Sequence, residues 1–386
     1  MTVSSKLKTL FVFGTRPEAI KLAPVVRELA ARPDFDCRIC VTGQHREMLA
    51  QVLDLFELRP DWDLDLMRPN QDLAYLTGAV LSGVGEVLRA FQPDRVIVQG
   101  DTTTTFAGAL AAFYHKVPVA HVEAGLRTDD IYSPWPEEIN RRLVTHIADL
   151  HFAPTARARA NLLREGVASE RIIVTGNTGI DALLAIADLV EARPDLRTGF
   201  IAEPPEHFAD RRLILLTGHR RESFDGGIAR VAAAVARIAD RADAAVVFPV
   251  HPNPNVRAAI APLRRHANVL LTGPVDYPEL VFLLKRCHFV VTDSGGIQEE
   301  APSFGKPVLV TRETTERPEA MELGLAKLVG TDEERLFAEM TALLEDPSTY
   351  QRMSRVANPY GDGRASRRIA RQLIGKAEAA CSKSVD

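Results

Sequence analysis

The sequence has few cysteines, no excess of basic residues and no long hydrophobic run. Its four cysteines, spread over 386 residues, are too few for a disulfide framework. Lys and Arg number 47 against 51 Asp and Glu, which gives a net charge of −4 and no basic field for a nucleic-acid backbone. No apolar stretch approaches the roughly 20 residues of a membrane span, and residues 9–13 are too short for the core of a signal peptide. We therefore expect a soluble, cytoplasmic protein that binds neither nucleic acid nor membrane.

The sequence also lacks the common signatures of metal, redox and dinucleotide sites. Cys37 and Cys40 form a C-x-x-C pair, but in the strand predicted there side chains three residues apart point to opposite faces. The histidines are isolated and give no metal-ligand spacing. There is no G-x-x-x-x-G-K-[ST] motif, and no G-x-G-x-x-G motif opens a predicted helix, which disfavours a P-loop nucleotidase and a bound dinucleotide. We expect no metal and no cofactor.

The pattern of the chain is that of an α/β protein. Hydrophobic residues (46%) and charged residues (25%) have the balance of a globular protein, and 386 residues exceed the usual size of one domain. Short β-branched or aromatic runs alternate with segments of helical period, such as 18–31 and 73–91, as in parallel sheets. The predicted strands are 9–13, 37–42, 95–99, 118–122, 150–153 and 171–175 in the first half, and 213–217, 245–250, 268–271, 289–292 and 307–310 in the second.

A change of composition separates these two halves. Residues 191–211 carry prolines and mixed charge without a clean period, so we predict a linker there. An N-terminal Rossmann-like domain is then expected over 1–190 and a C-terminal Rossmann-like domain over 212–363. Residues 364–386 are predicted to form a C-terminal helix, for which the N-terminal domain is a candidate docking surface.

Polar clusters follow six of the predicted strands. They are residues 14–21, 99–105, 121–127, 218–223, 251–255 and 293–300. Turn and N-cap residues explain any single cluster, and for residues 102–105 that explanation is as good as a functional one. In open parallel sheets, however, ligands bind beyond the carboxyl ends of the strands. Six clusters at such ends, divided between two halves, favour a ligand cleft between two domains.

The cluster at 293–300 has the features of a phosphate site. Ser294, Gly295 and Gly296 precede a predicted helix, whose first N–H groups and dipole favour an anion. Glu300 would accept hydrogen bonds from ribose hydroxyls, although a solvated carboxylate on the helix surface is the plainer alternative. Arg317 would reach a diphosphate. These residues predict a nucleoside diphosphate site in the C-terminal half.

Eight longer motifs occur in order along nearly the whole chain. They are FGTRPEAIK (13–21), GDTTTT (100–105), HVEAGLR (121–127), PEEINR (136–141), GHRRE (218–222), TDSGGIQEEAP (292–302), TTERP (314–318) and NPYGDG (358–363). Together they closely resemble the bacterial non-hydrolysing UDP-N-acetylglucosamine 2-epimerases. The resemblance implies a GT-B-like fold, with two Rossmann-like domains facing each other across a cleft, and a homodimer. It also implies interconversion of UDP-GlcNAc and UDP-ManNAc, without a redox cofactor, for cell-surface polysaccharide precursors.

The same resemblance implies which residues form the site. The catalytic residues would be Asp101, Glu123, Glu137 and His219. The substrate would be bound by Arg16, Lys21, Leu280, Ser294, Gly295, Gly296, Glu300 and Arg317.

Family members often carry a second UDP-GlcNAc, which acts as an activator, at a neighbouring site. In this sequence that site would be built from Gln44, His45, Arg46, Gln71, Glu137, Arg220 and His251. Two positions differ from the version of the site that the family shows: Glu47 stands in place of a Gln, and Asn70 in place of an Arg. The sequence therefore leaves activation by substrate open.

The implied reaction explains why these residue types are needed. The C2–H bond of an N-acetylhexosamine has no adjacent carbonyl to acidify it, so direct deprotonation is prohibitive. If the C1–O bond to UDP loosens first, elimination gives a 2-acetamidoglucal and UDP, and readdition with a proton on the other face gives the epimer. This path needs a diphosphate clamp, proton-transfer groups on both faces of C2, and exclusion of water. The sequence does not say which carboxylate serves which face.

Three other functions would show part of this pattern. A hydrolysing 2-epimerase would release ManNAc and UDP from the same intermediate. A GT-B glycosyltransferase would share the donor site but would need an acceptor. A non-catalytic UDP-sugar sensor would not need Asp101, Glu123 and His219 in addition to a diphosphate site. The fold alone does not distinguish among them.

Overall fold

The chain consists of two compact units. The computed structural model describes residues 6–43, 46–68, 71–193, 196, 208–218, 226–250, 253–315 and 317–383, without the side chains of 46–48, 255 and 375–383. The first unit is Met1–Ala182 with Tyr360–Asp386, and the second is Leu183–Pro359. The second unit thus begins inside helix α7 (Thr178–Ala192), whereas the sequence predicts the change of domain after residue 190. Most of the predicted linker lies outside the described residues.

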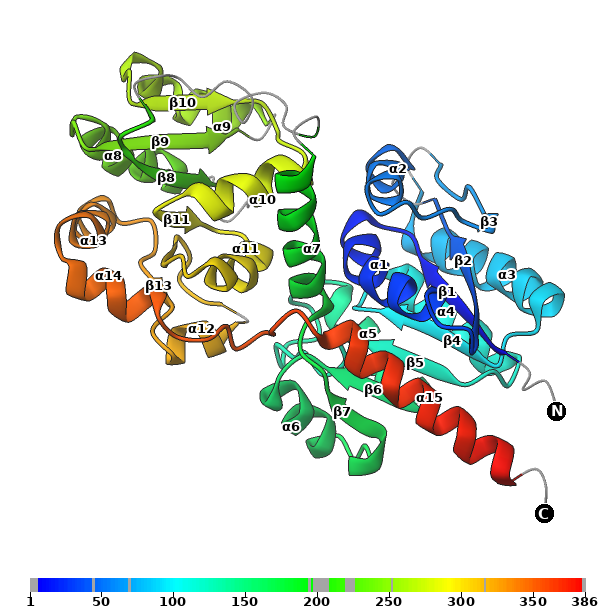
Figure 1. The fold of residues 1–386 in the computed structure, drawn as a ribbon. Helices are drawn as coiled ribbons and strands as arrows, with labels where there is room; N and C mark the ends of the chain where they lie inside the picture. Colours follow the sequence, from blue (N-terminus) through cyan, green and yellow to red (C-terminus); the bar gives the residue numbers. More distant parts are fainter. Residues whose placement is uncertain are drawn as a thin grey trace. The chain divides into compact units, whose positions relative to one another are not determined.

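A seven-stranded parallel sheet forms the centre of the first unit (Figure 1), in the order β3-β2-β1-β4-β5-β6-β7. Its strands are β1 (Leu7–Phe13), β2 (Phe35–Val41), β3 (Trp62–Asp63), β4 (Arg95–Gln99), β5 (Val119–Val122), β6 (Leu150–Ala153) and β7 (Ile172–Val174). Its helices are α1 (Arg16–Ala30), α2 (Arg46–Leu55), α3 (Leu73–Phe91), α4 (Thr103–Tyr114), α5 (Glu137–Ile147), α6 (Ala156–Arg164), the short η1 (Ser169–Arg171), the start of α7, and α15 (Ala365–Lys383). The chain order reverses between β1 and β4, and such a switch point is where α/β sheets bind ligands.

Burial on both faces explains why the strands of this sheet are continuous hydrophobic runs. Leu10 and Val12 on β1 and Val98 on β4 are fully buried in one cluster with apolar side chains of α3, α4 and α5. Thr15 is the N-cap of helix α1, the carboxylate of Glu18 accepts from the N–H of Thr15 at 2.8 Å, and Pro17 favours the first helical turn.

The C-terminal segment returns to the first unit and is fixed there by hydrogen bonds. The N–H of Asn177 donates to the carbonyl of Tyr360 at 2.6 Å. The buried carboxylate of Asp181 accepts from the N–H of Ala365 at 3.1 Å and from the N–H and hydroxyl of Ser366 at 2.8 and 2.6 Å. Helix α15 therefore starts on a buried cap, and it packs on α1.

The second unit has a six-stranded parallel sheet in the order β10-β9-β8-β11-β12-β13 (Figure 1). Its strands are β8 (Arg212–Thr217), β9 (Ala244–Pro249), β10 (Val269–Thr272), β11 (Phe289–Thr292), β12 (Val308–Val310) and β13 (Ala326–Leu328). Its helices are α8 (Gly227–Ala239), α9 (Pro254–Ala259), η6 (Ala261–Arg265), α10 (Tyr277–Arg286), α11 (Gly295–Glu300), η7 (Ala301–Phe304), α12 (Pro318–Glu322), α13 (Glu333–Glu345) and α14 (Pro347–Ser354). The switch point lies between β8 and β11, so Gly218 and Asp293 begin the two loops beside it.

The predicted α/β class with two Rossmann-like domains is confirmed. Each of the eleven predicted strands occurs with ends within two residues of the prediction. The sequence did not predict β3 and β13, because edge strands of two and three residues are too short for a pattern. Within the part of the chain that the structure describes, no helix has both the length and the apolar character that crossing a membrane requires.

Candidate active site

The switch point of the first sheet is organised around one buried carboxylate, Glu18, which is 1% exposed. Its Oε2 accepts from the N–H groups of Gly14 and Thr15 at 3.0 and 2.8 Å. Its Oε1 accepts from the hydroxyls of Thr102 and Thr105 at 2.7 and 3.0 Å. Burial raises the pKa of Glu18, against the opposing effect of these hydrogen bonds. The site residues inferred from the sequence did not include Glu18, although it lies within the polar cluster 14–21.

Asp101 lies in the turn between β4 and α4 and is held by helix α5. Its side chain is a quarter exposed and forms an ion pair with Arg141. The amide of Asn140 donates to the carbonyl of Asp101 at 3.0 Å. Arg141 is itself buried and donates to the fully buried Glu138 at 3.1 Å. Residues of the PEEINR motif thus orient Asp101, a role that the sequence analysis missed.

Glu123 directly follows β5 and forms an ion pair with Lys21 of α1, with both side chains largely buried. Its backbone is left-handed (φ 64°), an uncommon conformation for a residue other than glycine. Two residues later a Cβ at Gly125 would lie 2.3 Å from the carbonyl oxygen of Ala158, so only glycine fits this close approach. The loop that carries Glu123 is therefore pressed against α6.

His121 supports the same region from inside the sheet. It is fully buried, and its Nε2 lies 2.7 Å from the carbonyl oxygen of Gly100, so Nε2 must carry the proton. Burial lowers the pKa of His121 to about 3, and that of its neighbour His151 to about 4. His121 is thus a neutral donor that fixes the turn before Asp101.

Arg16 and Glu137 are placed at helix starts but are not tied into this network. Each is the first residue of its helix, α1 and α5, and is partly exposed. Neither side chain makes a hydrogen bond or ion pair with another of the residues described. The structure therefore brings Lys21 together with Glu123, while Asp101 is held by Arg141, and it leaves Arg16 and Glu137 accessible.

In the second unit the residues predicted to bind the diphosphate lie close together. Ser294 is the N-cap of α11, followed by Gly295 and the exposed Gly296. A Cβ at Gly295 would lie 2.5 Å from Nη1 of Arg317, which shows that the guanidinium lies against this turn. Arg317 is oriented by Glu299, to which its Nε donates at 2.7 Å. The sequence predicted the approach of Arg317 but not the role of Glu299.

Glu300 ends α11, and Leu280 lies on α10. The hydroxyl of Tyr277 donates to Oε1 of Glu300 at 3.0 Å, and Tyr277 is buried. Glu300 is therefore held in place on one side, unlike a freely solvated carboxylate. Leu280 is partly exposed, three residues after Tyr277 on the same helix.

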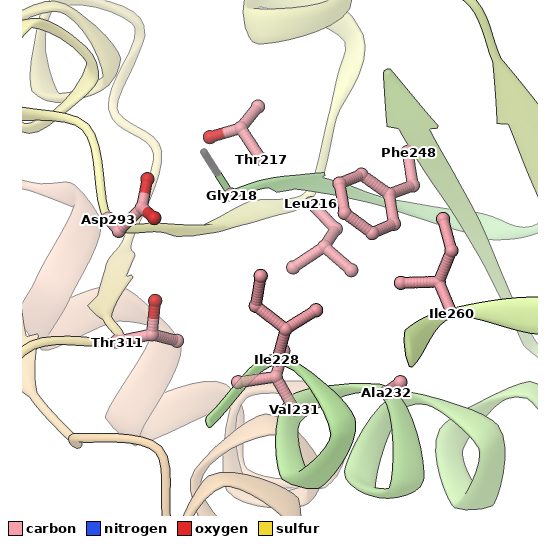
Figure 2. Close-up of a pocket in the computed structure, with 10 residues that line it drawn as sticks. All are labelled: Leu216, Thr217, Gly218, Ile228, Val231, Ala232, Phe248, Ile260, Asp293 and Thr311. Carbon is pink, nitrogen blue, oxygen red and sulfur yellow. The ribbon is translucent and has the colours of Figure 1, made fainter. Parts of the chain in front are cut away.

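A small cavity lies below the switch point of the second sheet (Figure 2). Its volume is about 20 Å³, enough for one water molecule and far below the size of a nucleotide-sugar site. Figure 2 shows Asp293, Thr217 and Thr311 on one side of it. The rest of the lining is mainly apolar: Leu216, Gly218, Ile228, Val231, Ala232, Phe248 and Ile260. The hydroxyls of Thr217 and Thr292 lie 2.6 Å apart and link β8 to β11 at this edge.

Several predicted site residues fall outside the described parts of the chain. These are His219, Gln44, His45, Arg220 and His251, the substituted position Asn70, and the side chains of Arg46 and Glu47. Gln71 is described, and its Oε1 accepts from the N–H of Arg68 at 3.1 Å. The described residues contain no group of three or more His, Cys, Asp or Glu side chains that could hold a metal ion.

Comparison with known proteins decides the family. The profile of the family described as UDP-N-acetylglucosamine 2-epimerase matches residues 27–374. The chain belongs to this family. The UDP-N-acetylglucosamine 2-epimerase of Escherichia coli K12 is 54% identical over 369 residues, which are 95% of this chain and 98% of that protein. The enzyme is therefore an epimerase, a kind of isomerase, as its motifs predicted.

Two solved structures of the family resemble this one along the whole chain. The Neisseria meningitidis UDP-GlcNAc 2-epimerase bound to UDP-GlcNAc has a TM-score of 0.87 and 48% identity, covering 95% of this chain and 100% of its own. The Methanocaldococcus jannaschii UDP-GlcNAc 2-epimerase in complex with UDP-GlcNAc and UDP has a TM-score of 0.77 and 35% identity, covering 95% and 99%. The two-unit α/β architecture is thus shared by the family.

Proposed function

We propose that the enzyme is a non-hydrolysing epimerase that interconverts UDP-GlcNAc and UDP-ManNAc by eliminating and readding UDP. One observation carries this proposal. Asp101 and Glu123 follow adjacent strands, since Gln99 of β4 pairs with Val122 of β5, and each carboxylate is oriented by a cation from a helix. Two oriented carboxylates at one sheet edge suit proton transfer, and a separate anion site suits a nucleotide that must be retained.

In the proposed reaction the second unit binds UDP. The N–H groups at Ser294–Gly296 and the guanidinium of Arg317 bind the diphosphate, and Glu300 binds the ribose. When the C1–O bond breaks, negative charge grows on the diphosphate, and the cations Arg16 and Lys21 stabilise it further. Leu280 contributes apolar contact to the nucleotide.

The first unit moves the protons. Asp101, Glu123 and Glu137 are the carboxylates proposed to remove the C2 proton and to return one on the opposite face, with His219 as a further acid, base or phosphate donor. Elimination forms the C1–C2 double bond of the glycal from the electrons of the C2–H bond, and UDP leaves with the electrons of the C1–O bond. Readdition reverses both changes, so no redox cofactor takes part.

The relatives with bound nucleotides support this ligand. The Neisseria meningitidis enzyme was solved with UDP-GlcNAc, and the Methanocaldococcus jannaschii enzyme with UDP-GlcNAc and UDP. A family member at 54% identity to the Escherichia coli K12 enzyme is expected to bind the same nucleotide sugar.

Incubation of the enzyme with UDP-GlcNAc in D2O, followed by NMR, tests the proposal. We expect UDP-ManNAc as the product, with deuterium at C2 of both sugars. Free ManNAc and UDP without UDP-ManNAc would instead establish hydrolysis. UDP-sugar that keeps its original C2 hydrogen would contradict the elimination.

We propose that the enzyme acts as a homodimer through the surface around α4 and α5. Phe113 and Tyr114 at the end of α4 are 59% and 64% exposed, and Tyr132 and Trp135 just before α5 are 75% and 62% exposed. The rings of Phe113 and Tyr114 lie side by side, with centroids 6.4 Å apart, and large exposed aromatic side chains are typical of protein interfaces.

We further propose that the enzyme works in the cytoplasm, that its UDP-ManNAc supplies a cell-surface polysaccharide, and that a second UDP-GlcNAc activates it. The activator would bind at Gln44, His45, Arg46, Gln71, Arg220 and His251. The substitutions Glu47 and Asn70 make this regulatory site the part of the proposal most in need of a test.

A further inference from the structure

The two oxygens of Glu18 serve two different loops. Oε2 closes the capping box of its own helix through Gly14 and Thr15. Oε1 accepts from Thr102 and Thr105, which follow Glu18 by 84 and 87 positions. One side chain therefore joins the turn that carries Arg16 to the turn that carries Asp101.

Helix capping accounts for only half of this arrangement. In a capping box the glutamate needs to accept only from the backbone N–H of the N-cap residue. Glu18 is 1% exposed, and burying a carboxylate is costly unless several donors surround it. Helix α4 has a cap of its own, because the hydroxyl of Thr102 accepts from the N–H of Thr105 at 3.1 Å. The bonds from Thr102 and Thr105 to Glu18 are thus not required to start either helix.

The same two turns are also in direct contact. A Cβ at Gly14 would lie 2.0 Å from Oγ1 of Thr42 and 2.7 Å from Oγ1 of Thr104, so the turn after β1 is wedged against the end of β2 and the start of α4. Packing sets the distance between the turns, and the directional bonds to Glu18 set their register.

We infer that Glu18 is a positioning residue, which holds the Arg16 turn and the Asp101 turn as one rigid unit at the switch point of the first sheet. The inference rests on the proposed function, in which Arg16 stabilises the leaving diphosphate and Asp101 transfers a proton at C2. Elimination needs both groups in place at the same moment, and a shift of about 1 Å in such a pair costs up to a hundredfold in rate.

The substitution Glu18→Gln tests this with little change of volume. An amide has one acceptor oxygen in place of two, so it cannot accept from both turns. We expect kcat for epimerisation to fall about tenfold or more, while KM for UDP-GlcNAc and the affinity for UDP change by less than about threefold. Circular dichroism and the thermal unfolding midpoint show whether the variant is folded.

Threonine variants of α4 provide matched controls that do not depend on the glutamate variant. Thr105→Val removes the hydroxyl that lies 3.0 Å from Oε1 of Glu18 and 2.6 Å from the carbonyl oxygen of Gln99, and Thr105→Ser keeps it, so kcat should fall in the first and recover in the second. Thr104→Val removes a fully buried hydroxyl from the same turn, one that pairs with Thr42 at 3.0 Å and not with Glu18. It should lower stability but leave kcat within about twofold.

The double variant of Glu18→Gln and Thr105→Val tests whether the two side chains act together. Its loss of kcat should be smaller than the product of the losses in the two single variants.

Two results would overturn the inference: an unchanged kcat in Glu18→Gln, or equal losses in Thr104→Val and Thr105→Val. Asp101→Asn separates this failure from that of the proposed function. If Asp101→Asn abolishes exchange at C2 while Glu18→Gln is fully active, the reaction stands and the positioning role falls. If Asp101→Asn exchanges at the normal rate, Asp101 has no role in proton transfer and the premise of the inference falls. The proposed function itself falls only if the wild-type enzyme incorporates no deuterium at C2.

Discussion

At the residue scale, the candidate catalytic groups depend on partners from distant parts of the chain. Asp101 is oriented by Arg141 and Asn140, and Glu123 by Lys21. In the second unit Glu299 orients Arg317. A charged group held by a buried partner loses little further entropy when substrate binds, so the geometry for reaction exists beforehand.

Asp101→Asn should abolish incorporation of solvent deuterium at C2, with kcat reduced about a hundredfold or more. The amide keeps an oxygen for Arg141, so the turn should stay in place, but it cannot accept a proton from carbon. UDP binding, measured by calorimetry, should stay within a few fold of the wild-type value. Exchange at the normal rate would remove Asp101 from proton transfer.

Gly295→Ala should weaken UDP binding about tenfold or more, because the new Cβ would lie 2.5 Å from Nη1 of Arg317 and displace the guanidinium. Gly296→Ala is the comparison. Its Cβ would meet nothing nearer than Oγ of Ser294 at 4.0 Å, so Arg317 stays in place. Calorimetry with UDP compares the two variants, and equal affinities would show that the position of Arg317 is unimportant.

At the scale of elements, the C-terminal helix is part of the first unit because of a cap supplied by another helix. Asp181 of α7 accepts three hydrogen bonds from the first two residues of α15, and Arg368 donates to the carbonyl of Thr175 at 3.0 Å. The cap and the contact with α1 hold α15 on the first unit after the chain leaves the second unit.

Asp181→Ala should lower the free energy of unfolding of the first unit by about 2–4 kcal/mol, because three donors lose their buried acceptor. Ser366→Ala removes only the hydroxyl, and we expect a loss of about 1 kcal/mol. Urea unfolding followed by circular dichroism measures both. Equal stability of Asp181→Ala and wild type would show that the cap does not hold α15.

At the scale of the whole molecule, two buried histidines make stability depend on pH. Burial lowers the pKa of His121 to about 3 and of His151 to about 4, from an ordinary value of 6.5. Below pH 6.5 both histidines bind a proton in the unfolded chain, whereas in the folded chain they remain neutral until the pH approaches their lowered pKa values. The stability that these residues contribute is therefore complete above pH 6.5 and is lost as the pH falls toward 4.

The free energy of unfolding should fall by up to about 1.4 kcal/mol per pH unit for each histidine between pH 6 and 5. His151→Asn should remove the contribution of one histidine to this pH dependence. Urea titrations of both proteins at several pH values give the difference, in which the other titrating groups cancel. Parallel profiles would contradict the assignment to His151.

The proposed dimer also belongs to this scale. Replacing Phe113 and Tyr114 together by Lys should give monomers in sedimentation velocity, since charges would be buried in an apolar contact. Leu323→Lys alters another exposed apolar side chain, 46% exposed in the second unit, and should leave the mass unchanged. A dimer that survives the double change would place the interface elsewhere.

The sequence by itself determined the class of fold and the places where chemistry could occur. Runs such as 10–13 and 289–292 are buried on both faces, so their composition reveals strands directly, and the residues that follow them must lie at strand ends. The motifs were long enough to identify the family. These features depend on neighbours in the chain, and a sequence records such neighbours.

Only the tertiary structure decided which of these residues act together. From the sequence Glu18 is only a residue of a helix cap, but in the structure it bonds to Thr105 at the start of α4. Arg141 is only a residue of a helix in the sequence, but in the structure it orients Asp101. Such contacts follow from the order of strands in a sheet and from the packing of helices against it. Those choices are made by the folded chain as a whole, and no local pattern contains them.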